Sequence, residues 1–209
     1  MQEIRRLIRE TRLIAILRGV PNDRILDTVR ALYAGGVRLA EIPFDQRNPP
    51  CAALAIHMLA RKSEVCVGAG TVMTPEQVDM AADAGARYII SPNVDRSVIE
   101  RTHARGLFSI PGAFTPSEVA DAWKYGADMV KLFPADALGV PYIRALAGPY
   151  PHIPLAAVGG MGEENARSFL DAGCVCVCAG GALTDRRLIA AGDWEALSEK
   201  ARRLCAAIA

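Results

Sequence analysis

Short apolar segments alternate with longer helix-like segments along the whole chain, and this alternation limits the possible folds more than any other feature. The helix-like segments end at glycines, as in YAGG at 33–36, DAGA at 83–86 and KYGA at 124–127. A helical pattern that stops at glycine is typical of a helix terminus. Eight apolar segments are predicted as strands: 13–18, 37–44, 65–70, 87–91, 107–112, 128–133, 153–158 and 174–179. Eight βα units favour an α/β fold of the (β/α)8 TIM-barrel type over an open doubly wound sheet.

The length of the chain fits one such barrel. A barrel of this type usually needs about 250 residues, and 209 lies at the short end of that range. No linker or low-complexity segment interrupts the repeat. We therefore expect a single barrel domain over residues 1–209, with a short helix at its N-terminus.

Composition argues against several classes of protein. The net charge is +1, and no basic stripe interleaved with aromatic residues is present, so no nucleic-acid partner is expected. No apolar run reaches the roughly 18 residues that suggest a membrane span. The first residues, MQEIRRLIRE, form a charged amphipathic segment that does not resemble a secretory signal. These features predict a cytoplasmic enzyme.

The cysteine-rich segment CVCVC at 174–178 raises the question of a metal site. Alternate residues of a strand lie about 6.6 Å apart, which is too far for three thiolates to converge on one zinc ion. The three histidines are scattered singly and join no ligand pattern. We therefore expect reduced, buried cysteines and no metal.

One lysine stands inside the apolar segment DMVKLF at 128–133. The chain has only four lysines against twenty arginines, and Lys62, Lys124 and Lys200 lie in polar helical segments. An unpaired ammonium in an apolar interior tends to lose its proton, and a neutral amine is a nucleophile. Lys131 is therefore either a nucleophile or a buried lysine paired with a carboxylate.

Strand parity brings a carboxylate toward Lys131. Alternate side chains of a barrel strand face the interior, so Met129 and Lys131 share one face, as do Leu39 and Glu41. Both charged residues lie near the carboxyl ends of their strands, where barrel enzymes place their active sites. A neutral lysine condenses with a ketone to form a Schiff base, and a nearby carboxylate can move the protons. The alternative is a structural Glu41–Lys131 ion pair.

Two glycine-rich turns follow the last two predicted strands. Gly159 and Gly160 lie in VGGMG, and Gly180 and Gly181 lie in AGGAL. Backbone N–H groups of such turns bind phosphate, and phosphate sites recur after strands seven and eight of these barrels. The pair of turns favours a phosphorylated substrate. GAGTVM at 68–73 is not a dinucleotide fingerprint, because methionine occupies its sixth position.

Seven segments together resemble one known family. LIAILRG, AEIP, GAGTV, SPN, PGAFTPSE, VKLFPA and AVGG, in this order, are similar to the class I aldolases for 2-keto-3-deoxy-6-phosphogluconate and 2-keto-3-deoxy-6-phosphogalactonate. The resemblance covers nearly the whole chain. It implies a TIM barrel, a homotrimer, pyruvate as a product, and neither metal nor organic cofactor.

The resemblance also implies roles for individual residues. Lys131 is the Schiff-base lysine, Glu41 is the general acid/base acting through a water, and Thr71 binds the pyruvyl carboxylate. The remaining residues expected to bind the 2-keto-3-deoxy sugar-acid phosphate are Arg18, Gly70, Pro92, Phe133, Val158, Gly159, Gly160, Gly180 and Gly181.

Within the family, AILRG and AVGG are more similar to the galactonate branch. The gluconate branch typically has threonine where Val158 stands, and an arginine where Asp45 stands. Arg18 is a candidate to supply that positive charge. The galactonate branch usually has asparagine-serine-proline where this chain has Asp45, Gln46 and Arg47, whose roles the sequence leaves open. Gly181 stands where the family usually has serine, so we expect a weaker preference for phosphorylated over unphosphorylated substrates.

These features predict an aldehyde-lyase that cleaves 2-dehydro-3-deoxy-6-phosphogalactonate to pyruvate and glyceraldehyde 3-phosphate. The alternative substrates are 2-dehydro-3-deoxy-6-phosphogluconate and 4-hydroxy-2-oxoglutarate. Two rival functions use different chemistry: a sugar-phosphate isomerase without a covalent intermediate, and a barrel that binds its ligand without turnover.

Overall fold

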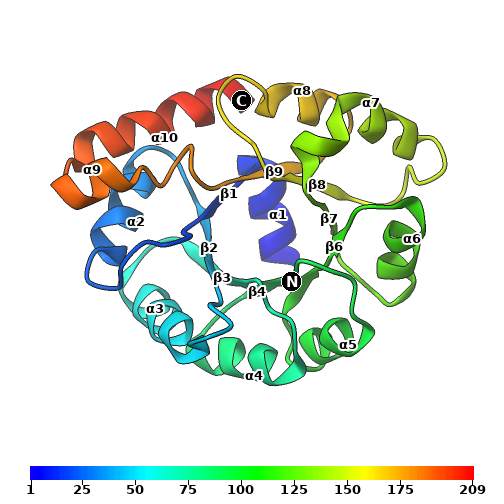
Figure 1. Ribbon diagram of the computed structural model, residues 1–209, viewed down its shortest axis with the longest axis horizontal. Coiled ribbons are helices and arrows are strands. Elements are labelled where there is room, and N and C mark those ends of the chain that lie inside the picture. The colour runs from blue at the N-terminus through cyan, green and yellow to red at the C-terminus, as the bar shows by residue number, and fades with distance from the viewer.

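Parallel strands and surrounding helices form a barrel in the computed structural model, which describes residues 1–209 (Figure 1). The strands are β1 Leu13–Ile16, β2 Leu39–Pro43, β3 Cys66–Gly70, β4 Tyr88–Ile90, β5 Phe108–Ile110, β6 Gly112–Ala113, β7 Val130–Leu132, β8 Leu155–Val158 and β9 Cys176–Ala179. The outer helices are α2 Ile25–Ala34, α3 Pro49–Lys62, α4 Pro75–Ala84, α5 Arg96–Ala104, α6 Pro116–Lys124, α7 Ala135–Ala147, α8 Ala166–Asp171, α9 Arg186–Ala191 and α10 Trp194–Ile208. The predicted alternation of strands and helices is confirmed.

The nine strands correspond to the eight predicted ones, because the fifth predicted strand is divided at Pro111. The sheet order is β5-β4-β3-β2-β1-β9-β8-β7-β6. β5 pairs with β4 and β6 pairs with β7, while Pro111 between them has no N–H to donate to a ladder. The two ends of the sheet thus belong to one continuous segment, 108–113, and this segment closes the barrel.

The side-chain parity predicted for the strands is confirmed. Leu39 and Met129 belong to the buried cluster inside the barrel. Ala40 and Val130, the residues next to them, belong to the larger apolar layer between the strands and the outer helices. The alternation therefore leaves Glu41 and Lys131 on the interior face, in register with these apolar residues.

Helix α1 (Gln2–Thr11) lies across one end of the barrel, as Figure 1 shows. Its residues Ile4 and Ile8 are buried in the interior cluster. Its residue Arg5 pairs at 3.1 Å with Asp128, which lies just before the start of β7. The helix therefore covers the N-terminal ends of the strands and leaves the C-terminal ends open.

No helix in the structure combines the length and the apolar character needed to cross a membrane.

Candidate active site

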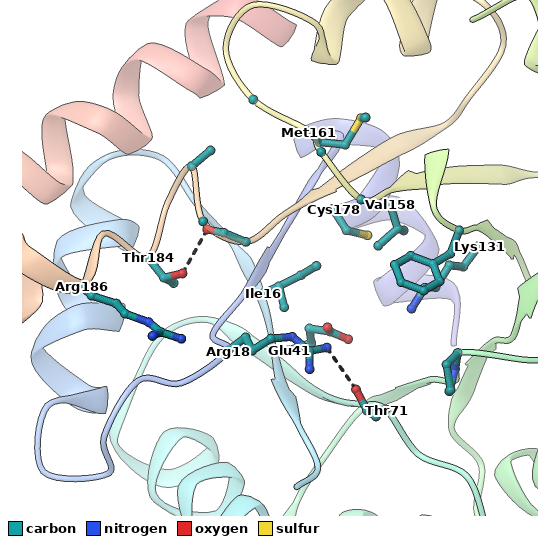
Figure 2. Close-up of a pocket in the computed structure, with 18 residues that line it drawn as sticks. Ile16, Arg18, Glu41, Thr71, Lys131, Val158, Met161, Cys178, Thr184 and Arg186 are labelled. Carbon is teal, nitrogen blue, oxygen red and sulfur yellow. Dashed lines mark hydrogen bonds between the residues drawn. The ribbon is translucent and has the colours of Figure 1, made fainter. Parts of the chain in front are cut away.

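A cavity of about 750 Å³ opens at the C-terminal ends of the strands (Figure 2). Its walls come from the ends of β1, β2, β7, β8 and β9 and from the loops that follow the strands. Every residue predicted for the site except Gly70 lines it: Arg18, Glu41, Thr71, Pro92, Lys131, Phe133, Val158, Gly159, Gly160, Gly180 and Gly181. Segments that are far apart in the sequence thus share one cavity.

Lys131 lies in the middle of β7 with its side chain toward the cavity. Only 7% of the residue is exposed. Burial lowers the pKa of its amine, while the carboxylate of Glu41 acts in the opposite direction. Its Nζ lies 4.5 Å from the centre of the Phe133 ring. The local environment therefore favours a larger neutral fraction of this amine than an exposed lysine has.

Glu41, on β2, is the carboxylate whose charge acts on this amine. It is 3% exposed, and its Oε2 has no hydrogen-bond partner. Burial raises the pKa of its carboxyl, and the charges of Lys131 and Arg18 oppose that rise. Glu41 and Lys131 interact electrostatically, but they form no ion pair within 4.0 Å. A structural Glu41–Lys131 ion pair is thus absent, and both groups are left free toward the cavity.

Gly70 has a different place from the one expected. It ends β3 next to Glu41, and a Cβ atom added there would lie 2.2 Å from Glu41 Oε2. Such a contact is impossible without displacing the carboxylate. Gly70 does not line the cavity and provides the space that the Glu41 side chain occupies, and its expected contact with substrate stays a prediction.

A chain of polar contacts holds the loop after β3. Arg18 Nη2 donates to Thr71 Oγ1 at 3.3 Å (Figure 2), and Gln46 Nε2 donates to the Thr71 carbonyl at 2.8 Å. Gln77 Nε2 donates to Gln46 Oε1 at 2.7 Å, and Gln77 Oε1 accepts from the Met73 N–H at 2.7 Å. Thr71 has a φ of 57°, a left-handed conformation that costs a threonine about 1–3 kcal/mol. These contacts stabilise that conformation.

The residues of segment 45–47, whose roles the sequence left open, make different contacts. Gln46 belongs to the Thr71 loop through its side chain. Asp45 Oδ1 accepts from the Arg47 N–H at 2.9 Å, which shapes the local turn. The strand pattern could not predict the Gln46 contacts, because Gln46 lies in the loop after β2, Thr71 in the loop after β3 and Gln77 in α4.

The two glycine turns present unused N–H groups. Gly159 and Gly160, after β8, have φ values of 103° and 68°, which favour glycine. The N–H groups of Gly159, Gly160 and Gly181 donate no hydrogen bond within the chain. The carbonyl of Gly180 accepts from the N–H groups of Leu183 and Thr184. Both turns can therefore direct backbone donors at an anion in the cavity.

Seven further residues line the cavity and were not predicted from the sequence: Ile16, Met161, Gly162, Cys178, Ala182, Thr184 and Arg186. Strand parity was a sufficient signal for Cys178, which shares a face with the interior residue Cys176. No such signal existed for Arg186, which stands beyond the glycine turn at the start of α9. The cysteines Cys174, Cys176 and Cys178 are free thiols, and no group of three metal-ligating side chains occurs in the structure.

Comparison with known proteins gives consistent results. The family model for KDPG and KHG aldolase matches residues 4–200. The chain is 40% identical to the 2-dehydro-3-deoxy-6-phosphogalactonate aldolase of Escherichia coli (strain K12) over 163 residues, covering 78% of this chain and 79% of the relative. It is 30% identical to the 2-dehydro-3-deoxy-phosphogluconate aldolase of Haemophilus influenzae over 205 residues, covering 97% and 95%.

A solved structure agrees in fold. The KDPG aldolase from Legionella pneumophila, with pyruvate captured as a covalent carbinolamine intermediate, has a TM-score of 0.86 at 27% identity. The alignment covers 94% of this chain and 95% of that one. The family match and the extent of these similarities, together with the barrel, show that the chain belongs to the KDPG and KHG aldolase family of lyases.

Proposed function

We propose that this chain is a class I aldolase that cleaves 2-dehydro-3-deoxy-6-phosphogalactonate to pyruvate and glyceraldehyde 3-phosphate, using Lys131 as the nucleophile. The observation that carries the proposal is the position of the Lys131 amine. It is buried at the C-terminal end of the barrel, its pKa is lowered by burial, and Glu41 is close enough to influence it. The covalent pyruvate adduct named for the Legionella pneumophila relative gives independent support.

The reaction begins when the neutral amine of Lys131 attacks the C2 carbonyl of the substrate. The carbinolamine gains a proton on its hydroxyl and loses water, which leaves an iminium. The bond between C3 and C4 then breaks, its electron pair moves into the iminium to give an enamine, and the C4 hydroxyl loses its proton as the aldehyde forms. Protonation of C3 and hydrolysis release pyruvate and restore the amine.

Glu41 is the proposed general acid/base for these steps, acting through a water molecule. A carboxyl whose pKa is raised by burial holds its proton at higher pH than an exposed one, so it can both accept and return protons. Because its Oε2 has no partner within the chain, this oxygen is available to a bound water. Each proton released at one step can thus be returned at another.

The remaining cavity residues are assigned to binding. Thr71 and Arg18 bind the pyruvyl carboxylate, and Pro92, Phe133 and Val158 form the wall beside the reacting carbons. The N–H groups of the two glycine turns bind the phosphate. The proposal includes a homotrimer in the cytoplasm and needs neither a metal nor an organic cofactor.

Substrate choice is tested by comparing the two epimers at C4. Val158 cannot donate the hydrogen bond that a threonine would offer to a substrate hydroxyl, so we expect preference for the galactonate epimer without exclusivity. The measurement is kcat/KM for both phosphorylated epimers and for 4-hydroxy-2-oxoglutarate. The assay monitors the release of pyruvate from each substrate. A preference for the gluconate epimer of about tenfold or more would reject the substrate assignment and favour 2-dehydro-3-deoxy-6-phosphogluconate.

A non-covalent sugar-phosphate isomerase and a ligand-binding barrel are rival functions of a different class. Neither would release pyruvate from these acids, and neither needs an amine in the cavity. Release of pyruvate by the wild-type protein, abolished in the variant Lys131→Ala, is expected of the aldolase alone, because neither rival forms pyruvate.

A further inference from the structure

Arg186 is a positive charge in the active-site cavity that the proposed reaction does not use. It begins α9, five residues after Gly181, and it lines the same cavity as Lys131 and the glycine turns. Figure 2 shows it extending toward Arg18 from the side of the β9 loop. It also lines a neighbouring hollow of about 400 Å³, together with Arg18 and Thr184. Arg186 therefore lies where the two hollows adjoin.

The guanidinium of Arg186 has no partner in the chain. It takes part in no hydrogen bond and no ion pair within 4.0 Å. The adjacent acid, Asp185, caps α9 and pairs with Lys200 at 3.1 Å, so its charge is directed elsewhere. The acid of the neighbouring hollow, Asp23, pairs with Arg24 at 3.9 Å. Two arginines, Arg18 and Arg186, thus face the cavity edge with no acid bound to Arg186.

The turn after β9 provides no side chain at Gly181. A Cβ atom at Gly181 would contact nothing within 4 Å, so the turn after β9 leaves open space where a side chain could stand. Arg186 Nη2 lies 3.2 Å from the position that a Cβ of Gly19 would take, so the guanidinium packs against the loop after β1. Gly181 and Arg186 therefore border the same cavity, the first without a side chain and the second with a guanidinium.

We propose that Arg186 is a specificity-determining residue that binds the phosphate of the substrate, supplying a charged contact in the cavity that the two glycine turns also line. This inference rests on the proposed aldolase function. Guanidinium groups bind phosphate through two parallel hydrogen bonds, which a lysine or a backbone N–H cannot reproduce. The preference for phosphorylated over unphosphorylated substrates then depends on Arg186 as well as on the glycine turns.

The test compares Arg186→Gln with Arg187→Gln. Arg187 is the next residue along α9, is exposed, and does not line the cavity, so it controls for a change of net charge on the same helix. The measurement is kcat/KM for the phosphorylated sugar acid and for its unphosphorylated counterpart. We expect Arg186→Gln to lower kcat/KM for the phosphorylated substrate roughly tenfold to a hundredfold, because a hydrogen bond between charged groups is lost. For the unphosphorylated substrate, kcat/KM should fall about twofold or less. Arg187→Gln should change neither, and Arg186→Lys should recover part of the loss.

The outcomes separate this inference from the proposed function. Pyruvate has no phosphate, so Arg186→Gln should still form the pyruvate adduct on Lys131 at the wild-type rate. If the wild-type protein forms no such adduct, the aldolase proposal fails. If the adduct forms but Arg186→Gln lowers kcat/KM equally for both substrates, or for neither, Arg186 does not bind the phosphate and the inference is wrong.

Discussion

Lys131 and Glu41 each have a pKa that burial moves in one direction and the partner's charge moves in the other. Burial favours the neutral form of both groups, which suits a nucleophile and a proton carrier. The attraction between the two charges opposes both of these pKa shifts. The pKa of each group therefore depends on the charge of its partner as well as on burial, and removing one member should change the titration of the other.

Replacing Glu41 by Gln should shift the titration of Lys131 to lower pH. The neutral amine becomes more abundant as pH rises through its pKa, and the Glu41 charge raises that pKa. Without this charge, adduct formation with pyruvate should reach half of its maximum at a lower pH than in the wild-type protein. Trapping with cyanoborohydride across a pH series measures the midpoint, and Glu3→Gln, an exposed acid paired with Arg87, is the control. An unchanged or higher midpoint would contradict a charged Glu41 beside the amine.

Replacing Gly70 by Ala should impair proton transfer without unfolding the barrel. The added methyl group would overlap Glu41 Oε2 and displace the carboxylate. Since positioned acid/base groups contribute about 10²–10⁴ in rate, we expect exchange of the pyruvate methyl protons to slow roughly tenfold or more. Gly148→Ala is the control, because its Cβ would lie 3.6 Å from the nearest atom, the carbonyl oxygen of Ala145. Exchange at the normal rate in Gly70→Ala would show that Glu41 does not need its present position.

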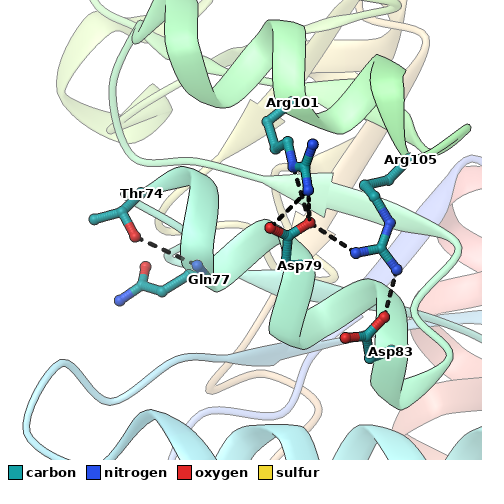
Figure 3. Close-up of polar contacts among 6 residues, drawn as sticks. All are labelled: Thr74, Gln77, Asp79, Asp83, Arg101 and Arg105. Carbon is teal, nitrogen blue, oxygen red and sulfur yellow. Dashed lines mark hydrogen bonds and ion pairs between the residues drawn. The ribbon is translucent and has the colours of Figure 1, made fainter.

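At the scale of elements, α4 connects the active-site loop to the helical layer. Its cap residue Thr74 accepts from the N–H of Gln77, as Figure 3 shows. The side chain of Gln77 in turn donates to Gln46. On the outer face of the same helix, Asp79 accepts from Arg101 Nε and Nη2 at 2.9 Å and from Arg105 Nη1 at 2.7 Å. Arg105 also pairs with Asp83. These contacts join α4 to α5 and fix the helix from which Gln77 extends.

Asp79→Asn should lower the melting temperature at neutral pH and have little effect in acid. The hydrogen bonds from Arg101 and Arg105 lower the pKa of Asp79 below its usual value of 3.8. A folded-state pKa below the unfolded-state value stabilises the protein above the unfolded pKa, and that contribution disappears as pH falls through the folded pKa. Thermal unfolding at neutral and acidic pH measures the difference. Glu10→Gln, which breaks a single pair with Arg6 at 3.4 Å, should have the smaller effect at neutral pH, and an equal effect would argue against the network.

At the scale of the whole molecule, the closed end of the barrel stabilises the fold and the open end carries the chemistry. Helix α1 covers the N-terminal ends of the strands and adds apolar side chains to the interior cluster. The cavity lies at the opposite ends. Stability and catalysis should therefore respond separately to substitutions at the two ends.

Ile8→Ala tests this separation. Ile8 is fully buried beneath the barrel, so its truncation should cost about 2–5 kcal/mol of unfolding free energy. Arg9→Ala, an exposed neighbour, should change stability by about 0.5 kcal/mol or less. Urea unfolding gives both values, and under native conditions the Ile8→Ala protein should form the pyruvate adduct normally. A cost below about 1 kcal/mol would mean that α1 does not contribute to the barrel core.

The sequence predicted those parts of the molecule that depend on periodicity. Strand parity placed Lys131 and Glu41 on the interior, and the order of the strands placed the glycine turns beside them. The division of the fifth strand at Pro111 follows from the absence of a proline N–H, although the apolar pattern alone predicted one strand there. Three features were not predictable in this way: the Gln46 contacts, the position of Arg186 and the function of Gly70. Each depends on how segments distant in sequence approach one another, which no local pattern records.

Attack of the Lys131 amine on the keto group can be detected by reductive trapping of the iminium. The protein is treated with pyruvate and borohydride, digested, and analysed by mass spectrometry, with a sample lacking pyruvate as the control. Only four lysines occur in the chain, so the modified peptide identifies the residue without ambiguity. We expect irreversible inactivation and the added mass on the peptide that contains Lys131. Modification of Lys62, Lys124 or Lys200 instead, or no modification, would contradict this expectation.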